Sequence, residues 1–170
     1  EDALQHIRDG VDLYKMFAAS AFNLDYDSIA KDSIERFIAK VCCLQLIYSS
    51  GAIKLQASIR TNSKGKITVS VEEAERLKDI YRRVNYKIKE SWYEGSNIID
   101  WIAHDESHTA YGFLPVHGKK GILKPSGLYM PYPGLKQTHN EKGTEWNYDT
   151  KRGRNTLKDK EYGGKVLQRC

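Results

Sequence analysis

The sequence predicts an α+β fold in which helices come first and a small antiparallel β region follows. Apolar residues recur at helical spacing through residues 1–111, whereas 112–170 contain short runs of Tyr, Leu, Ile and Val separated by glycines and by all 4 prolines. We therefore expect two regions, a helical one over 1–111 and a β-hairpin one over 112–170 that ends at the start of a helix.

Each helix expected in the first half begins at a residue that can accept the free amides of a first turn. Asp12 precedes a helix that reaches about residue 23, and Asp32 or Ser33 precedes the next one. Residues 49–51, Ser-Ser-Gly, mark a break, after which 52–59 return to a helical pattern.

The longest expected helix follows Ser70. Ser70 and Glu73 form the pair that is typical of a capping box, and apolar residues then recur at steps of three and four as far as Trp92. We expect one helix of more than about five turns here. Helical structure is expected to continue after Gly95 through residues 98–102.

Turn signals divide the second region into hairpins. Residues 124–127 place proline second and glycine fourth, which is typical of a tight β-turn. Residues 145–148 and 155–157 are expected to be paired strands that are joined through 151–154. The pair of glycines at 163–164 then precedes the start of a helix.

Composition excludes several classes of protein. Hydrophobic residues make up 40% and charged residues 29% of the 170 residues. No stretch approaches the roughly 20 apolar residues that span a bilayer, and the start lacks the basic and apolar segments of a secretion signal. Adjacent Cys42 and Cys43 lie in an apolar run, and with Cys170 they are expected to be reduced thiols of a cytoplasmic protein. We therefore expect no membrane partner.

The net charge of +5 is unevenly distributed along the chain. Residues 1–30 carry two basic and six acidic side chains, and 91–114 carry four acidic ones. By contrast, 31–90 carry thirteen basic and seven acidic side chains, and 115–170 carry twelve and five. A polyanion that touches both basic blocks would explain this alternation, and nucleic acid is the usual polyanion. Plain solvated side chains are the alternative.

The most informative segment is 34–48, an otherwise apolar helical run with Arg36 and Lys40 one turn apart. Leu44 and Tyr48 continue the same four-residue step, and Arg36, Lys40 and Leu44 share one face of the helix. One interpretation is an amphipathic core helix with two solvated bases. The other is a clamp for a triphosphate, which requires that neither cation be buried in an internal ion pair.

Four stretches carry a resemblance to a known family. They are DGVDLYKMFAASAF (9–22), RFIAKVCCLQLIYSSGAIKLQ (36–56), LKPSGLYMPYPGL (123–135) and EYGGKV (161–166). Together with the long helical segment that ends near Trp92, their order and approximate spacing resemble family A DNA polymerases of the bacteriophage type. The resemblance covers almost the whole chain and places it between the two metal-carboxylate motifs of the family.

The resemblance implies that the first helical block is the fingers subdomain and that the strands belong to the palm and the template-side loop. It also implies that Arg36 and Lys40 hold the β- and γ-phosphates of the incoming dNTP. A guanidinium suits a bidentate phosphate contact, and an ammonium supplies a compact charge beside the leaving group. Lys40 is also the candidate catalytic residue, because it could protonate the departing pyrophosphate.

The same resemblance implies further site residues. Leu44 occupies the place of an aromatic residue that packs on the deoxyribose, and Tyr48 matches the tyrosine that lies against the nascent base pair and the template DNA. Tyr14 falls where bacterial relatives place a histidine that contacts phosphate. The segment that would contact template-primer DNA opens the last helix and consists of Gly163, Gly164 and Lys165.

The chemistry of the family requires carboxylates that bridge two Mg²⁺ ions, and the resemblance puts both of them outside residues 1–170. We therefore expect this chain alone not to polymerise DNA. Its expected partners are template-primer DNA, dNTP and the remaining polymerase segments or chains. The expected location is the cytoplasm of a bacterial host, with a phage or prophage as the source of the gene.

The chain departs from the family at Gln45, Ser49 and Ser50, where glycines are common in relatives. Loss of glycine is expected to stiffen the hinge that opens and closes the fingers. The departure concerns the conformational change and leaves the resemblance itself intact.

A second motif has the letters of a metal site but the wrong position. His104, Asp105 and Glu106 spell the tripeptide of the family's second metal motif, yet they precede the glycine pair instead of following it. We interpret them as a surface segment. A metal-dependent hydrolase that uses His104, Asp105 and His108 is one alternative function, and a nucleic-acid-binding remnant without catalysis is another. A cysteine enzyme has less support, because the paired cysteines lack an evident histidine partner.

Overall fold

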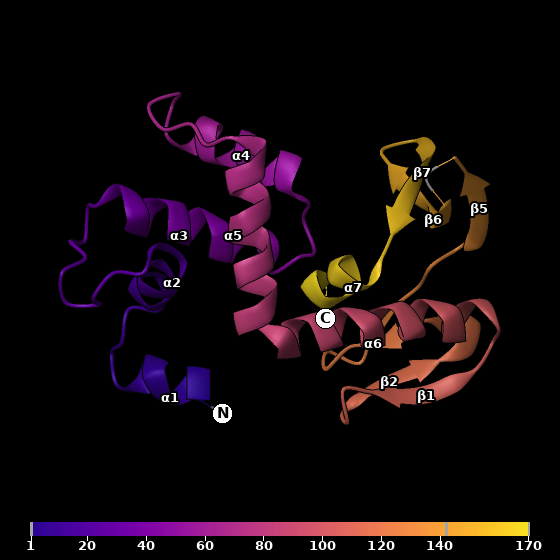
Figure 1. The fold of residues 1–170 in the computed structure, drawn as a ribbon. Helices are drawn as coiled ribbons and strands as arrows, with labels where there is room; N and C mark the ends of the chain where they lie inside the picture. The colour runs from indigo at the N-terminus through magenta and orange to yellow at the C-terminus, as the bar shows by residue number, and fades with distance from the viewer. Residues whose placement is uncertain (1, 142, 170) are drawn as a thin grey trace. The chain divides into compact units, whose positions relative to one another are not determined.

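The computed structural model describes residues 2–141 and 143–169 and divides into two compact units, 1–86 and 87–170 (Figure 1). Within the described residues the chain forms seven α-helices, one 3-10 helix and seven strands, so the predicted α+β class is confirmed. The units divide before the predicted boundary at 111/112, and the fingers and palm division stays a prediction. Across the described ranges, no helix combines the length and the apolar character needed to cross a membrane.

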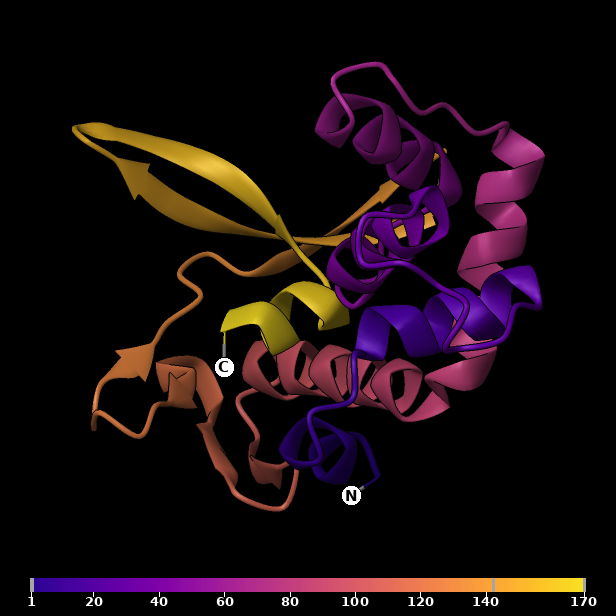
Figure 2. The same cartoon turned by 90° about the vertical axis from the view of Figure 1, so that its left-hand side faces the viewer.

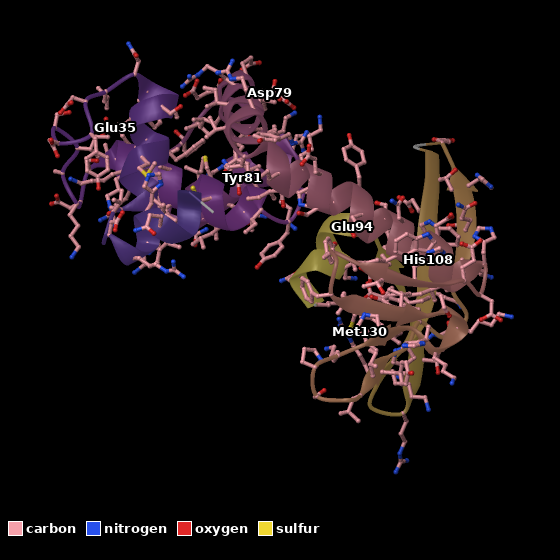
Figure 3. All side chains as sticks on the ribbon, turned by 90° about the horizontal axis from the view of Figure 1, so that it is seen from below. Glu35, Asp79, Tyr81, Glu94, His108 and Met130 are labelled. Atoms are coloured by element: carbon pink, nitrogen blue, oxygen red, sulfur yellow. The ribbon has the colours of Figure 1, made fainter. Side chains whose placement is uncertain are left out.

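The first unit is helical in the part that the structure describes. Its helices are α1 (Asp2–Arg8), α2 (Leu13–Phe22), α3 (Ile34–Leu46), α4 (Ala52–Asn62) and α5 (Val71–Val84). Helices α2 to α5 pack against one another. Tyr81 of α5, labelled in Figure 3, is buried and meets the ring of Phe17 edge-on at 5.6 Å between centroids. The largest buried side chains of this core include Leu46, Leu55, Ile59 and Leu77.

Side-chain caps begin α2 and α3 where the sequence predicts them. Asp12 accepts hydrogen bonds through Oδ1 from the amides of Tyr14 (2.9 Å) and Lys15 (3.2 Å). Of the two candidates before α3, Ser33 is the cap, because its Oγ accepts a hydrogen bond from the amide of Arg36 at 3.2 Å. These contacts satisfy amides that have no partner within the helix.

Ser70 caps α5, but only half of the predicted capping box forms. The Oγ of Ser70 accepts a hydrogen bond from the Glu73 amide at 3.1 Å. The carboxylate of Glu73 instead pairs with the guanidinium of Arg76, at 2.8 Å to Nη2. The ion pair between residues one turn apart replaces the return contact to the cap.

The prediction of one long helix after Ser70 is wrong, because the chain breaks at Asn85. Helix α5 ends at Val84, and the next helix begins directly after Asn85. The backbone amide of Asn85 makes the last helical hydrogen bond of α5, to the carbonyl oxygen of Tyr81 at 2.9 Å, and its side-chain amide donates to the same oxygen at 3.0 Å. The backbone of Asn85 itself leaves the helical region, with φ of −107° and ψ of 47°. A local side-chain contact of this kind competes with the helical hydrogen-bond pattern, and the apolar periodicity does not reveal it.

The second unit combines two helices with two antiparallel sheets. A four-stranded sheet has the order β1-β2-β3-β4, and a three-stranded sheet has the order β5-β6-β7. One apolar cluster joins Ile98, Ile99 and Ile102, which lie in the long helix that opens this unit, to strand residues of the same unit. The elements are α6 (Tyr86–Ala103), β1 (Ser107–Ala110), β2 (Leu114–His117), η1 (Gly118–Lys120), β3 (Ile122–Leu123), β4 (Tyr129–Met130), β5 (Lys136–Asn140), β6 (Gly143–Arg152), β7 (Asn155–Glu161) and α7 (Gly163–Arg169).

The predicted turns lie where expected, although the strands differ in length. The amide of Gly127 donates a hydrogen bond to the carbonyl oxygen of Lys124 at 2.9 Å, and this bond closes the turn between β3 and β4. β6 continues through Arg152, which pairs with Asn155 of β7, so the connecting loop is only residues 153–154. The structure therefore has a longer β6–β7 hairpin than the sequence predicts.

Helix α7 packs on α6 through glycine. A Cβ atom on Gly163 would overlap the carbonyl oxygen of Trp92, and a Cβ atom on Gly95 would meet the backbone of Gly163. Figure 1 shows α7 against α6 within this unit. Glycine is therefore required at this crossing, because the two backbones approach too closely for a side chain.

Candidate nucleotide-binding site

Two of the predicted phosphate-binding residues lie side by side although they come from different helices. The guanidinium carbon of Arg36, in the first turn of α3, lies 5.6 Å from the ring centroid of Tyr14, in the first turn of α2. This distance is within the range of a cation–π contact. The starts of α2 and α3 therefore form one surface that carries a cation and a phenol.

Arg36 is not a free cation, which departs from the requirement stated for the clamp. Its Nε donates to Oδ2 of Asp12 at 2.7 Å, and its Nη1 donates to the carbonyl oxygen of Lys31 at 3.1 Å. The side chains of Arg36 and Asp12 are 18% and 27% exposed, so the ion pair is partly buried. The prediction of an unpaired Arg36 is wrong, because an acceptor on α2 reaches the inner edge of the guanidinium.

The ion pair leaves part of the guanidinium available. Nη2 donates to none of the described residues, and one N–H of Nη1 also remains. The outer edge of Arg36, formed by its two terminal nitrogens, therefore retains N–H donors that suit a phosphate. Asp12 holds the inner edge, so the pair fixes the direction in which these donors point.

The electrostatics of Asp12 agree with a permanent ion pair. Burial raises the pKa of its carboxyl group, but hydrogen bonds from Arg36 and from the amides of Lys15 and Tyr14 outweigh it and hold the pKa below its ordinary value of 3.8. The carboxylate is therefore charged at neutral pH. The amide of Asp12 itself donates to the hydroxyl of Tyr26 at 3.0 Å, which fixes the backbone at this corner.

Lys40 and Leu44 extend the surface along α3. Lys40 is exposed, and its ammonium forms no ion pair with any residue that the structure describes. Leu44 is 56% exposed, as are other large apolar side chains of this unit such as Ile34 and Ile53. Arg36, Lys40 and Leu44 lie on the side of α3 away from its buried residues, as their spacing predicts.

Tyr48 does not extend this helical face, because α3 ends before it. The last residue of α3 is Leu46, and Tyr48 lies half-buried in the turn that follows. Ser49 comes next with φ of 62°, in the left-handed region that glycine adopts more easily. The prediction that Tyr48 continues the stripe of Arg36 and Lys40 is therefore wrong, while its contact with a base pair stays a prediction.

Gln45 and Ser50, where the chain also departs from the family pattern, take part in a hydrogen-bond network. The side-chain amide of Gln45 donates to Oγ of Ser50 at 3.0 Å, and its side-chain oxygen accepts from the hydroxyl of Ser58 at 3.3 Å. Nη2 of Arg82 lies 3.4 Å from the carbonyl oxygen of Ser50 and donates to it. The Gln45 side chain thus ties the end of α3 to α4 by contacts that glycine could not make, whereas the contact with α5 uses the backbone carbonyl of Ser50. The expected stiffening of a hinge stays a prediction.

The predicted DNA-contacting segment lies in the second unit. Gly163 and Gly164 are buried, and Gly163 serves the crossing with α6. Nζ of Lys165 pairs with Oδ1 of Asp159 at 2.9 Å and donates to the carbonyl oxygen of Lys160 at 2.6 Å. These internal contacts account for Gly163 and Lys165 without DNA, and a DNA contact there stays a prediction.

The tripeptide at 104–106 is exposed, which confirms its interpretation as a surface segment. His104 follows the end of α6, whereas His108 lies in β1, so the two do not share a helical face. The ring of His108, labelled in Figure 3, stacks on Trp101 at 4.4 Å between centroids. Within residues 2–141 and 143–169, no three His, Cys, Asp or Glu side chains gather in a group that could hold a metal ion.

The residue that sequence reasoning missed is Asp12 in its second role. The sequence identifies it as the cap of α2, which is a contact with residues two and three positions ahead. Its ion pair with Arg36 spans 24 positions, and no local pattern indicates it. The one sequence feature that pointed to this role was the presence of a charged cap, Asp12, two positions before the predicted phosphate ligand Tyr14.

Comparisons with known proteins identify no family. No protein-family model matches the chain, and no curated protein matches it. The resemblance to family A polymerases stays a prediction that rests on the residues themselves.

Proposed function

We propose that this chain is the nucleotide-binding fingers and adjoining palm segment of a family A DNA polymerase of the bacteriophage type, acting within a larger or split enzyme. One observation carries the proposal. Tyr14 and Arg36, which the resemblance assigns to the same triphosphate, lie 5.6 Å apart across two helices, with Lys40 one turn further along α3. Proximity of these side chains does not follow from the spacing within α3 alone.

In this proposal each side chain has a separate task. The outer edge of Arg36 binds phosphate oxygens bidentately, and the exposed ammonium of Lys40 neutralises charge beside the leaving pyrophosphate and donates a proton to it. The hydroxyl of Tyr14 donates to a phosphate oxygen. Exposed Leu44 packs against the deoxyribose. An aliphatic side chain suits this contact better than a polar one.

Mg²⁺ would supply activation of the primer hydroxyl and stabilisation of the leaving oxygen. The described residues contain no group of carboxylates suited to hold it. The proposal therefore assigns no metal ligand to this chain, and Lys40 contributes to turnover only when companion polymerase segments are present.

Binding of dATP by the chain tests the proposal. We expect backbone signals from the first turns of α2 and α3, and the Nε–H signal of Arg36, to shift in heteronuclear NMR spectra with dATP and not with deoxyadenosine. Loss of a hydrogen bond to a charged phosphate is worth about 1.5–3 kcal/mol, so Arg36→Ala and Lys40→Ala should each weaken binding about tenfold or more. Lys54→Ala is the matched control, because Lys54 is an exposed lysine of α4 in the same unit.

Equal shifts with dATP and deoxyadenosine would overturn the proposal, as would equal losses for Lys40→Ala and Lys54→Ala. The catalytic role of Lys40 is tested in primer extension with the complete polymerase. Normal turnover of a Lys40→Ala enzyme would refute that role.

A second candidate is nucleic-acid binding without nucleotide chemistry, and the ion pair between Arg36 and Asp12 favours it. A guanidinium that is already paired has less charge to offer a triphosphate. This candidate gives salt-sensitive DNA binding that is unchanged by Arg36→Ala, whereas the polymerase proposal gives loss of dATP binding in the same variant.

A further inference from the structure

The β6–β7 hairpin is a long, narrow ribbon that extends away from α6 and α7 in the second unit (Figure 2). Seven residue pairs join the strands, from Trp146 opposite Glu161 to Arg152 opposite Asn155. The loop contains only Gly153 and Arg154, and Gly153 has a φ of 61°, as the first position of a tight hairpin turn requires. The turn therefore holds the end of the ribbon in a defined conformation.

Charges near the base of the ribbon are paired. The ammonium of Lys160 lies 2.6 Å from Oε2 of Glu145, and the ammonium of Lys158 pairs with Asp149. The buried carboxylate of Glu161 accepts a hydrogen bond from Nη1 of Arg169 at 2.8 Å. Each anion here has a cation beside it, so this part of the ribbon offers little charge to a ligand.

The tip differs from the base. Lys151, Arg152 and Arg154 are all exposed, and none forms an ion pair or hydrogen bond through its side chain with a residue that the structure describes. Three cations within four positions repel one another, and no carboxylate lies between residues 150 and 156 to offset them. A rigid element that concentrates like charge at its end is suited to a polyanion.

The chemistry of the tip selects among polyanions. Residues 150–156 contain no apolar side chain, and the nearest one, Leu157 opposite Thr150, is a single leucine that is 43% exposed. The tip therefore lacks the buried aromatic anchor that is typical of protein interfaces. Phosphate contacts need only cations and hydrogen-bond donors, which Arg152, Arg154, Asn155 and Thr156 supply. The guanidinium groups match phosphate oxygens in geometry as well as in charge.

We propose that the tip of the β6–β7 hairpin, defined by Lys151, Arg152 and Arg154, is a sequence-independent contact for the sugar-phosphate backbone of nucleic acid. The inference rests on the proposed function, because it gives template-primer DNA a docking point on the second unit apart from the nucleotide-binding residues of α2 and α3. It concerns only backbone phosphates and no base.

The salt dependence of DNA binding tests the inference. Each phosphate that the protein neutralises in duplex DNA contributes about 0.9 to the slope of log K against log salt concentration, so loss of three contacts lowers the slope by about 2–3. Fluorescence anisotropy with a labelled primer-template duplex over a series of KCl concentrations measures this slope. The test variant replaces Lys151, Arg152 and Arg154 together by Gln.

The matched control replaces Lys54, Lys64 and Lys66 by Gln, which removes the same charge from three exposed lysines of the first unit. We expect the tip variant to lose about 2–3 in slope and the control to lose less than about 1. Equal losses in both variants, or the wild-type slope in the tip variant, would overturn the inference. Circular dichroism and the fluorescence of Trp146 in β6 verify that the ribbon still folds.

Two further measurements separate this inference from the proposed function. If the chain binds no dATP but the tip variant still loses DNA affinity, the polymerase proposal fails and the hairpin contact stands. If dATP binding is intact and the DNA slope is unchanged by the tip substitutions, the hairpin contact fails alone. Binding of polyglutamate that depends on the tip as strongly as DNA binding would assign the tip to acidic proteins and overturn the choice of nucleic acid.

Discussion

Replacing Asp12 by Asn tests whether one carboxylate both begins α2 and holds the guanidinium of the candidate site. Asn keeps an oxygen that accepts the amides of the first turn, so the cap survives and the charge is lost. The contact with Arg36 spans 2.7 Å between side chains that are 27% and 18% exposed. Exposed ion pairs contribute about 0.2–1 kcal/mol and hydrogen bonds to charged groups about 1.5–3 kcal/mol, so we expect this partly buried pair to contribute about 1–2 kcal/mol.

Urea unfolding of four proteins measures this contribution: the wild type, Asp12→Asn, Arg36→Gln and the double variant. At pH 7 the double-mutant cycle should give a coupling energy of about 1–2 kcal/mol. Far-UV circular dichroism follows all the helices, of which α1 to α5 belong to the first unit and α6 and α7 to the second. Fluorescence of the 3 tryptophans reports the second unit separately, because all of them lie within residues 87–170.

The pH dependence supplies a second criterion. Because the folded-state pKa of Asp12 lies below its ordinary value of 3.8, its contribution to stability is complete above that pH and is lost as the pH falls through the folded-state pKa. The stabilities of the wild type and Asp12→Asn should therefore converge in acid. A coupling energy near zero at pH 7, or a difference that persists unchanged in acid, would refute this account of the site.

Three further substitutions or reactions have defined outcomes. Ser49→Gly should raise the free energy of unfolding in urea by about 0.5–1 kcal/mol, because Ser49 has a φ of 62°; a loss of stability would contradict this. In a Cys170→Ser protein, Cys42 and Cys43 should react with a disulfide reagent at pH 8 only as the protein unfolds, since burial raises the pKa of each thiol to about 12; rapid reaction of the native protein would be the opposite result. Gly163→Ala should lower the free energy of unfolding by about 1–3 kcal/mol, because its Cβ would overlap the α6 backbone, and an unchanged denaturation midpoint would argue against the packing described.

Contacts between neighbouring positions were predictable from the sequence. Caps at Asp12, Ser33 and Ser70 involve amides only two or three residues ahead, so the residue type and its place before an apolar run were sufficient. The common face of Arg36 and Lys40 is equally local, because it depends only on the helical rotation per residue.

Failures of prediction have two physical sources. The break at Asn85 interrupts no apolar pattern, since the same spacing serves two successive helices as well as one. Helix α3 ends before Tyr48, where a local contact of Gln45 with Ser50 and a longer-range contact with Ser58 bridge the turn. The apolar spacing by itself indicates the position of neither helix end.

The sequence by itself determined the α+β class, the starts of the helices and the chemical character of the candidate site, because these depend on residue type and short spacing. Only the tertiary structure decided that Asp12 pairs with Arg36 across 24 positions, and that, among the described residues, the cations of the β6–β7 ribbon are paired near its base and unpaired at its tip. The reason is that charge pairing depends on distances between residues remote in the chain, and the packing of helices and the register of strands set those distances.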